Sequence, residues 1–259
     1  MVKAIFFDID GTLVSFETHC IPASTIQVLT KVREKGIKLY IATGRAKRVI
    51  NNLQGFSFDG FITMNGSVCY NAANEVIYSR PFAPADLKTM EGILMKEPSL
   101  PCFVLTKEEL YVVNRNEQVT AFTKLLNFPE LPDIEAHKIQ TLDVYQFSPF
   151  FNEEMEQMYM PLMCESVATR WHPSFVDIAR KGNTKALGID HVLSHYGINL
   201  ADCMAFGDGG NDIDMIQHVP IGIAMGNAID ELKKVADYIT TSVDHKGIEN
   251  ALRYFGVID

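Results

Sequence analysis

The chain has 259 residues, 47% of them hydrophobic and 21% charged, which provides enough apolar surface for one large domain or two smaller ones. Its 32 acidic and 23 basic residues give a net charge of −9, which argues against nucleic acid or an anionic membrane surface as the main partner. No apolar run approaches the roughly 20 residues of a membrane span, and the first residues lead straight into Asp8 and Asp10, so we expect a cytoplasmic protein without a signal peptide.

The first part of the chain alternates short apolar runs with a helical pattern. Residues 4–9 and 37–42 predict buried strands, and the 3.6-residue period of residues 23–35 predicts a helix between them. Because a crossover helix between such short apolar strands normally makes them parallel, we expect a βαβ unit. A further helix is expected after Arg45, and a third strand at residues 60–64.

The middle of the chain has a different pattern of predicted elements, in which two helical stretches interrupt a series of strands that includes hairpin-like pairs. The strands are predicted at residues 102–105, 110–114, 143–148, 167–171 and 175–179. The α/β pattern then resumes, with strands at 203–206, 221–224 and 238–240 and helices beginning near Asn211 and Ala228. We therefore predict an α/β core formed by residues 1–81 and 183–259, into which residues 82–182 are inserted as an α+β domain.

The motif DIDGT, residues 8–12, follows directly after the first predicted strand. Side chains two positions apart on a strand point the same way, so the carboxylates of Asp8 and Asp10 emerge together at the strand's carboxyl end. Ligands bind at that edge of open parallel sheets. Two carboxylates so close repel each other, which implies a bound metal or a shared proton. The alternative is a plain Asp-Gly turn that caps a helix.

A second acidic turn, GDGGND at residues 207–212, follows the strand at 203–206. Asp208 and Asp212 add two carboxylates at another strand end. Three or four carboxylates with no nearby His or Cys form a hard oxygen site, which suits Mg²⁺ better than zinc. A glycine turn in which Asn211 or Asp212 only caps the next helix is the open alternative.

Phosphate-binding chemistry is indicated at two further places. Thr43 offers a hydroxyl, Gly44 lets a backbone N–H approach a ligand closely, and the expected helix start favours an anion. Whether Arg45 contributes is left open. Lys185 lies at the start of a predicted helix, where a cation is unfavourable unless an anion lies nearby. A solvated lysine, or Lys181 in its place, remains the alternative.

Taken in order, DIDGT, ATGR, Lys185 and GDGGND resemble the four motifs of the haloacid dehalogenase-like (HAD) phosphohydrolases. The insertion, and the tail from residue 225 through Gly247, are similar to the Cof-type branch with its α+β (type IIB) cap. The resemblance implies a Rossmann-like parallel-sheet core with the cap inserted between the ATGR and Lys185 motifs. It also implies an enzyme, a phosphoric monoester hydrolase.

By position, the resemblance makes Asp8 the nucleophile and Asp10 the general acid and base. It implies phosphate contacts from Thr43, Gly44, Lys185 and Asn211. It implies a Mg²⁺ ion held by Asp8, the Asp10 backbone carbonyl and Asp208, with Asp212 in support. We therefore expect a Mg²⁺-dependent phosphatase that hydrolyses small phosphate monoesters through an aspartyl-phosphate intermediate.

The expected substrate is a sugar phosphate. Residues 83–182 hold 15 acidic and 9 basic residues, net −6, which disfavours polyanions, and a cap of this size excludes bulky partners. A small phosphate ester is thus the expected partner, with no nucleic acid, membrane or obligate protein partner. A phosphomutase, or a receiver-like signalling module with a phosphorylated Asp, is the alternative.

Overall fold

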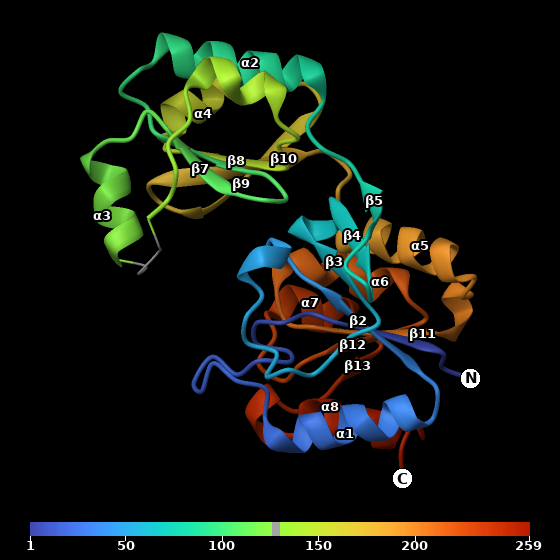
Figure 1. The fold of residues 1–259 in the computed structure, drawn as a ribbon. Coiled ribbons are helices and arrows are strands. Elements are labelled where there is room, and N and C mark those ends of the chain that lie inside the picture. Colours follow the sequence, from blue (N-terminus) through green and yellow to red (C-terminus); the bar gives the residue numbers. More distant parts are fainter. Residues whose placement is uncertain (126–129) are drawn as a thin grey trace. The chain divides into compact units, whose positions relative to one another are not determined.

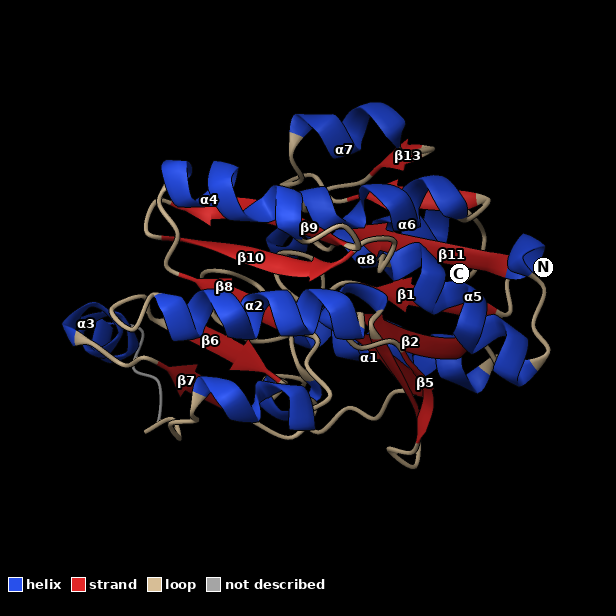
Figure 2. Ribbon diagram, turned by 90° about the horizontal axis from the view of Figure 1, so that it is seen from above, coloured by secondary structure: helices blue, strands red, loops and turns tan. Residues whose placement is uncertain are grey.

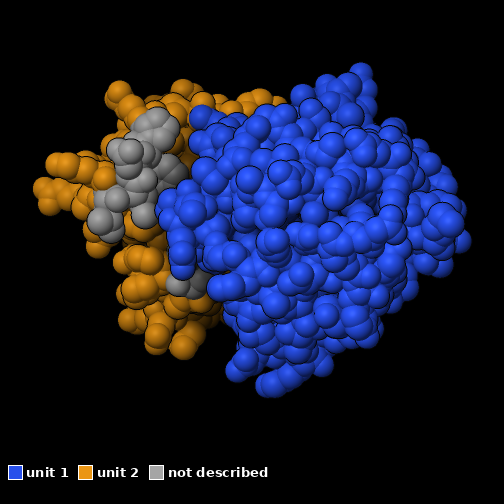
Figure 3. Space-filling model, turned by 90° about the horizontal axis from the view of Figure 1, so that it is seen from below, with its two compact units in different colours: residues 1–79, 183–259 blue, residues 80–182 orange. Residues whose placement is uncertain are grey.

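The computed structural model describes residues 1–125 and 130–259. These residues form two compact units, and each is described by itself. Unit 1 contains Met1–Ser79 and Asn183–Asp259, and unit 2 contains Arg80–Gly182 (Figure 3). Among the described residues, none of the helices combines the length and hydrophobicity needed to cross a membrane.

Unit 1 is built on an eight-stranded sheet with the order β13-β12-β11-β1-β2-β3-β4-β5. The pairs from β13 to β3 are parallel, and β4 and β5 complete the sheet as antiparallel strands. The strands are β1 (Ala4–Phe7), β2 (Lys38–Ala42), β3 (Gly60–Thr63), β4 (Val68–Asn71), β5 (Val76–Ser79), β11 (Cys203–Gly207), β12 (Ile221–Ala224) and β13 (Tyr238–Ile239).

Helices cover both faces of this sheet, with α5, α6 and α7 on one side and α1 and α8 on the other (Figure 1). They are α1 (Ala23–Glu34), α5 (Lys185–Tyr196), α6 (Ile213–His218), α7 (Asp230–Val235) and α8 (Gly247–Tyr254). Strand β1 lies between β11 and β2, and every residue of it is buried. A parallel strand covered on both faces carries a continuous apolar run, which explains the sequence Ala-Ile-Phe-Phe.

Unit 2 is an α+β unit on a five-stranded antiparallel sheet with the order β7-β6-β8-β10-β9. Helices α2 and α4 lie across these strands (Figure 2). The strands are β6 (Cys102–Leu105), β7 (Leu110–Val113), β8 (Gln146–Pro149), β9 (Ser166–His172) and β10 (Phe175–Arg180). The helices are α2 (Pro84–Lys96), α3 (Glu117–Leu125) and α4 (Glu153–Tyr159). A core between helices and sheet includes Met90, Phe147 and Ile178.

The predicted fold class, a parallel-sheet α/β core with an inserted α+β cap, is confirmed. The two helical stretches predicted between the strands of unit 2 correspond to α3 and α4. Helix α2, the hairpin β4–β5 and helix α8 were not predicted, and one predicted helix is wrong. The helix expected after Arg45 is only the 3-10 turn Lys47–Val49, which buries no residue and so has no apolar face to hold a helix against the core.

The packing of α6 on β12 gives a test of this core. Replacing Gly222 with alanine would place a Cβ atom 2.1 Å from the carbonyl oxygen of Ile216. We expect Gly222→Ala to lower the free energy of unfolding, measured by urea denaturation, by about 1–3 kcal/mol. Gly92 in α2 is the control, because a Cβ atom there meets nothing within 4 Å. Gly92→Ala should be neutral or stabilising by up to about 1 kcal/mol. An equal change in the free energy of unfolding in the two variants would contradict the described packing.

Candidate active site

The strand order brings the polar motifs to one edge of the unit 1 sheet. Asp8 follows β1, Thr43 follows β2 and Asp208 follows β11, and these three strands are neighbours. The backbone N–H of Asp8 still bonds the carbonyl of Phe206, at 3.1 Å, so the two acidic motifs leave the sheet side by side. Parallel strands end at the same edge, which is where such sheets bind ligands.

Lys185 is the buried centre of this group. Its ammonium Nζ lies 2.5 Å from Oδ1 of Asp8 and 2.6 Å from Oδ1 of Asp212, and its side chain is 0% exposed. It is the first residue of α5, after Thr184, whose hydroxyl accepts the backbone N–H of Leu187 as the helix cap. The cap fixes where α5 begins and so where Lys185 enters the site.

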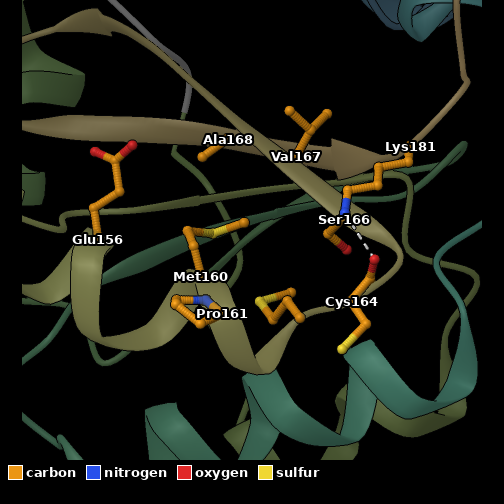
Figure 4. A pocket seen from close by; sticks show the side chains of 9 residues that line it. Glu156, Met160, Pro161, Cys164, Ser166, Val167, Ala168 and Lys181 are labelled. Carbon is orange, nitrogen blue, oxygen red and sulfur yellow. Dashed lines mark hydrogen bonds between the residues drawn. The ribbon is translucent and has the colours of Figure 1, made fainter.

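The alternative lysine, Lys181, belongs to unit 2. Its Nζ donates to the carbonyl oxygen of Cys164 at 2.8 Å. It also lines a surface cavity of about 500 Å³ beside Met160, Ser166 and Val167 (Figure 4). None of the predicted site residues lines this cavity. The contacts of Lys185 with two site carboxylates favour it over Lys181 as the lysine of the site.

Asp212 organises the acidic loop. While its Oδ1 accepts from Lys185, its Oδ2 accepts the backbone N–H groups of Asp208 and Gly209, both at 2.9 Å. Asp208 is held in turn by the hydroxyl of Thr12, which donates to its Oδ1 at 2.9 Å. Both oxygens of Asp212 therefore already accept hydrogen bonds, Oδ1 from Lys185 and Oδ2 from the loop, which favours Asp8 and Asp208 as the candidate metal ligands.

Asp10 is paired with Arg45, whose contribution the sequence left open. The guanidinium donates from Nε to Oδ2 at 2.7 Å and from Nη2 to Oδ1 at 2.6 Å. Both side chains are about one third exposed. This two-point pair brings the ATGR motif to the DIDGT motif and holds the Asp10 carboxylate in one orientation.

The Thr43–Gly44 turn includes a neighbour that sequence analysis missed. Thr43 is buried, and its hydroxyl accepts the backbone N–H of Arg45 at 3.1 Å. Gly44 lies against the side chain of Asn65, which accepts a hydrogen bond from the Asn211 amide at 2.9 Å. The available signal was an Asn-Gly pair directly after the third predicted strand, at the same sheet edge.

The site has an excess of negative charge that a bound cation would balance. Among the described residues, the four carboxylates of Asp8, Asp10, Asp208 and Asp212 are accompanied by two basic side chains, Lys185 and Arg45. Ligand oxygens of Asp8, Asp208 and Asp212 lie within 4.8 Å of one another. A compact, buried set of carboxylate oxygens fits a hard divalent ion such as Mg²⁺.

Burial and mutual repulsion raise the pKa values of two carboxyl groups in this cluster. Desolvation raises the pKa of Asp208 to about 6, with a further contribution from the neighbouring Asp212 and opposition from the Thr12 hydrogen bond. Desolvation likewise raises the pKa of Asp8, against the attraction of Lys185. A cation bound among these groups would favour their ionised forms.

Fold and site together define a HAD-type phosphoric monoester hydrolase, the class of enzyme that the sequence predicted. The chain belongs to the haloacid dehalogenase-like hydrolase family, whose model matches residues 5–252. The predicted family is therefore confirmed.

Relatives match over essentially the whole chain. "Putative phosphatase YkrA" of Bacillus subtilis (strain 168) is 31% identical over 266 residues, spanning 99% of this chain and 98% of the relative. The solved structure of the HAD subclass IIB sugar phosphatase BT4131 is 43% identical, with a TM-score of 0.85, and covers 99% of this chain and 100% of that one. The phosphatase BT1666 of Bacteroides thetaiotaomicron is 36% identical, with a TM-score of 0.90, over 100% of this chain and 96% of that one.

The raised pKa values predict how a cation affects stability. A carboxyl group whose pKa is higher in the folded than in the unfolded chain stabilises the fold at low pH. This stability is lost as the pH rises from about 3.8 through the folded pKa, about 6 for Asp208. We therefore expect Mg²⁺ to raise the Tm, and to raise it more at pH 8 than at pH 6, because the ion binds the ionised carboxylates.

Thermal unfolding with and without Mg²⁺ at the two pH values checks this expectation. Asp208→Asn should reduce the rise in Tm that Mg²⁺ causes. Asp214 is an exposed residue of α6, and Asp214→Asn should leave that rise in Tm unchanged. A rise that is the same at both pH values, or the same in both variants, would contradict the assignment of the carboxylate cluster.

Proposed function

We propose that the chain is a Mg²⁺-dependent phosphatase that hydrolyses small phosphate monoesters, sugar phosphates in particular, through an aspartyl phosphate on Asp8. The observation that carries the proposal is the buried Lys185 ammonium shared between Asp8 and Asp212 beside Asp208. A carboxylate beside a buried ammonium, in an acidic cluster suited to a divalent ion, is equipped to attack an anionic ester.

In the proposed first step, Asp8 attacks phosphorus and the bond to the leaving oxygen breaks. A phosphate monoester dianion repels a carboxylate, so attack needs positive charge close to both. Lys185, 2.5 Å from Asp8, provides part of that charge and orients the nucleophile. Mg²⁺, held by Asp8 and Asp208 together with the Asp10 backbone carbonyl, would supply further charge neutralisation when bound. Asp212 supports the site by holding Lys185 and the acidic loop.

Asp10 is proposed to protonate the leaving oxygen and then to take a proton from the water that hydrolyses the aspartyl phosphate. Both of its oxygens accept hydrogen bonds from Arg45 in this structure. Asp10 can therefore reach the leaving group only when this pair opens or shifts.

The phosphoryl oxygens are proposed to bind Thr43, the Gly44 backbone N–H, Lys185 and Asn211. Thr43 and Gly44 follow β2, and Asn211 lies in the acidic loop beside Gly44, so the donors come from neighbouring segments. The donors act on charge that builds up in the transition state, where fixed dipoles are most effective.

Sugar phosphates are the proposed substrates for two reasons. The 43% identical BT4131 is described as a sugar phosphatase, and its chain is covered in full. The net charge of −6 on residues 83–182 disfavours polyanionic esters. A cytoplasmic location and the lack of an obligate protein partner stay predictions from the sequence.

Asp8→Asn should abolish turnover, because an amide is a poor nucleophile and a weak metal ligand. The measurement is Mg²⁺-dependent phosphate release from a panel of sugar and nucleotide monophosphates, with the variant as the blank. Full activity of Asp8→Asn would overturn the proposal. Isomerised sugar phosphates in place of inorganic phosphate would indicate a mutase, and a long-lived aspartyl phosphate without turnover a signalling module.

Asp10→Asn should lower kcat by about 10²- to 10⁴-fold with the fold intact, since it removes the proton donor and acceptor. Steady-state kinetics together with a thermal unfolding curve separate this effect from misfolding. A loss smaller than tenfold would place the acid and base role on another residue.

Lys185→Ala should weaken both phosphate binding and kcat, because the ammonium acts on ground and transition states alike. Lys181→Ala is the matched control, since the Nζ of Lys181 donates to the Cys164 carbonyl in unit 2, whereas the Nζ of Lys185 contacts Asp8 and Asp212. Measurement of kcat, KM and inhibition by inorganic phosphate in both variants decides between the lysines. Loss of activity in Lys181→Ala alone would reverse the assignment.

A further inference from the structure

The turn between β3 and β4 has an unusual backbone. Met64 (φ 49°), Asn65 (φ 51°) and Gly66 (φ 89°) follow one another in the left-handed region. Glycine adopts this region freely and asparagine tolerates it, but a long side chain such as that of methionine is strained there. Such strain persists only where surrounding structure holds it, and it gathers at functional sites.

Backbone contacts hold the turn in place against the predicted phosphate-binding segments. The N–H of Asn65 bonds the carbonyl of Thr43 at 3.0 Å, and the N–H of Met64 bonds that of Arg45 at 3.1 Å. On the other side, Gly66 lies so close to Thr184 that a Cβ atom would stand 1.9 Å from the Thr184 carbonyl oxygen. The turn is thus wedged between the ATGR motif and the residue that caps the Lys185 helix.

The consequence of this backbone is the place of the Asn65 side chain. In a simple turn an asparagine bonds its own neighbouring backbone. Here Oδ1 of Asn65 instead accepts a hydrogen bond from the Asn211 amide, 146 residues further along the chain. A Cβ atom on Gly44 would lie 3.2 Å from Oδ1 and 3.3 Å from Nδ2 of Asn65. Asn65 therefore stands between two of the proposed phosphate ligands.

We infer that Asn65 is a positioning residue of the phosphate site, which orients the Asn211 amide toward the phosphoryl group of a phosphate monoester. An amide with one N–H engaged by Asn65 has its plane fixed, so its remaining N–H keeps one direction. Preset donors of this kind assist catalysis because no reorganisation is needed during the reaction. The inference rests on the proposed function, since it takes Asn211 and Gly44 as phosphate ligands.

Asn65→Gly removes the side chain and keeps the backbone conformation, so it tests the role of the side chain alone. Glycine adopts φ 51° without strain, so the turn and the Tm should be preserved. With p-nitrophenyl phosphate as substrate, we expect kcat/KM to fall at least about tenfold and the inhibition constant of inorganic phosphate to rise. A purely structural role of the turn predicts no change in either quantity, and that result would overturn the inference.

Asn74 provides a matched control for this substitution. It is also an asparagine in the left-handed region (φ 64°), but it is exposed in the β4–β5 hairpin. Asn74→Gly should leave kcat/KM and phosphate inhibition unchanged. An equal loss in both variants would show that glycine substitution in unit 1 acts through general flexibility and would also overturn the inference.

A double-mutant cycle tests whether Asn65 acts through Asn211. The double variant Asn65→Gly with Asn211→Ala should be no worse than Asn211→Ala alone, because nothing remains to be positioned. If the losses in kcat/KM of the two single variants multiply in the double variant, the inference is overturned. If Asn65→Gly lowers the Tm, Asn65→Asp replaces it, since Asp has the same shape and tolerates the same backbone. Its charge beside Gly44 should weaken inhibition by phosphate, and unchanged inhibition would overturn the inference.

Failure of this inference and failure of the proposed function are distinguishable. If the wild-type protein releases no phosphate from any ester, the proposed function fails. If the wild-type protein hydrolyses esters and Asn65→Gly does so equally well, only the role of Asn65 fails.

Discussion

The ion pair of Lys185 with Asp8 and Asp212 is the interaction on which the site depends. An ammonium that is 0% exposed is tolerated only with charged partners in contact, and Lys185 has two of them. As the first residue of α5 it also stands at the positive end of the helix dipole, where a cation is unfavourable. The two carboxylates compensate both costs, and they join the ends of β1 and β11 to the start of α5.

Asp212 extends this constraint to the acidic loop. Its second oxygen accepts the N–H groups of Asp208 and Gly209, so the residue that holds Lys185 also fixes the loop that carries Asp208. The loop can come this close because residue 207 is glycine, where a Cβ atom would lie 2.6 Å from that of Asp212. Burial raises the pKa values of Asp8 and Asp208, and repulsion from Asp212 adds to the effect, so the protein without a cation holds this cluster at some cost to its stability.

Much of the fold could be predicted from the sequence because the parallel strands are continuous apolar runs that end in acidic or glycine-containing motifs. Several features that the sequence did not predict depend on contacts between distant segments. The local sequence does not indicate that the residues after Arg45 have no core surface to pack against. It also does not indicate that the Arg45 side chain donates hydrogen bonds to Asp10. Asn65 was not among the predicted site residues, because its partner Asn211 is remote in sequence. The roles of the predicted site residues stay predictions, although the structure brings their side chains to one edge of one sheet.

The most direct test of the account is to find where the phosphoryl group goes. The enzyme is mixed with Mg²⁺ and a phosphate ester that it hydrolyses, quenched with acid during turnover and analysed by peptide mass spectrometry. The account predicts an acid-stable, alkali-labile phosphate on Asp8, absent from Asp8→Asn. Phosphate on another residue, or steady hydrolysis with no phosphorylated peptide at any time, would contradict it.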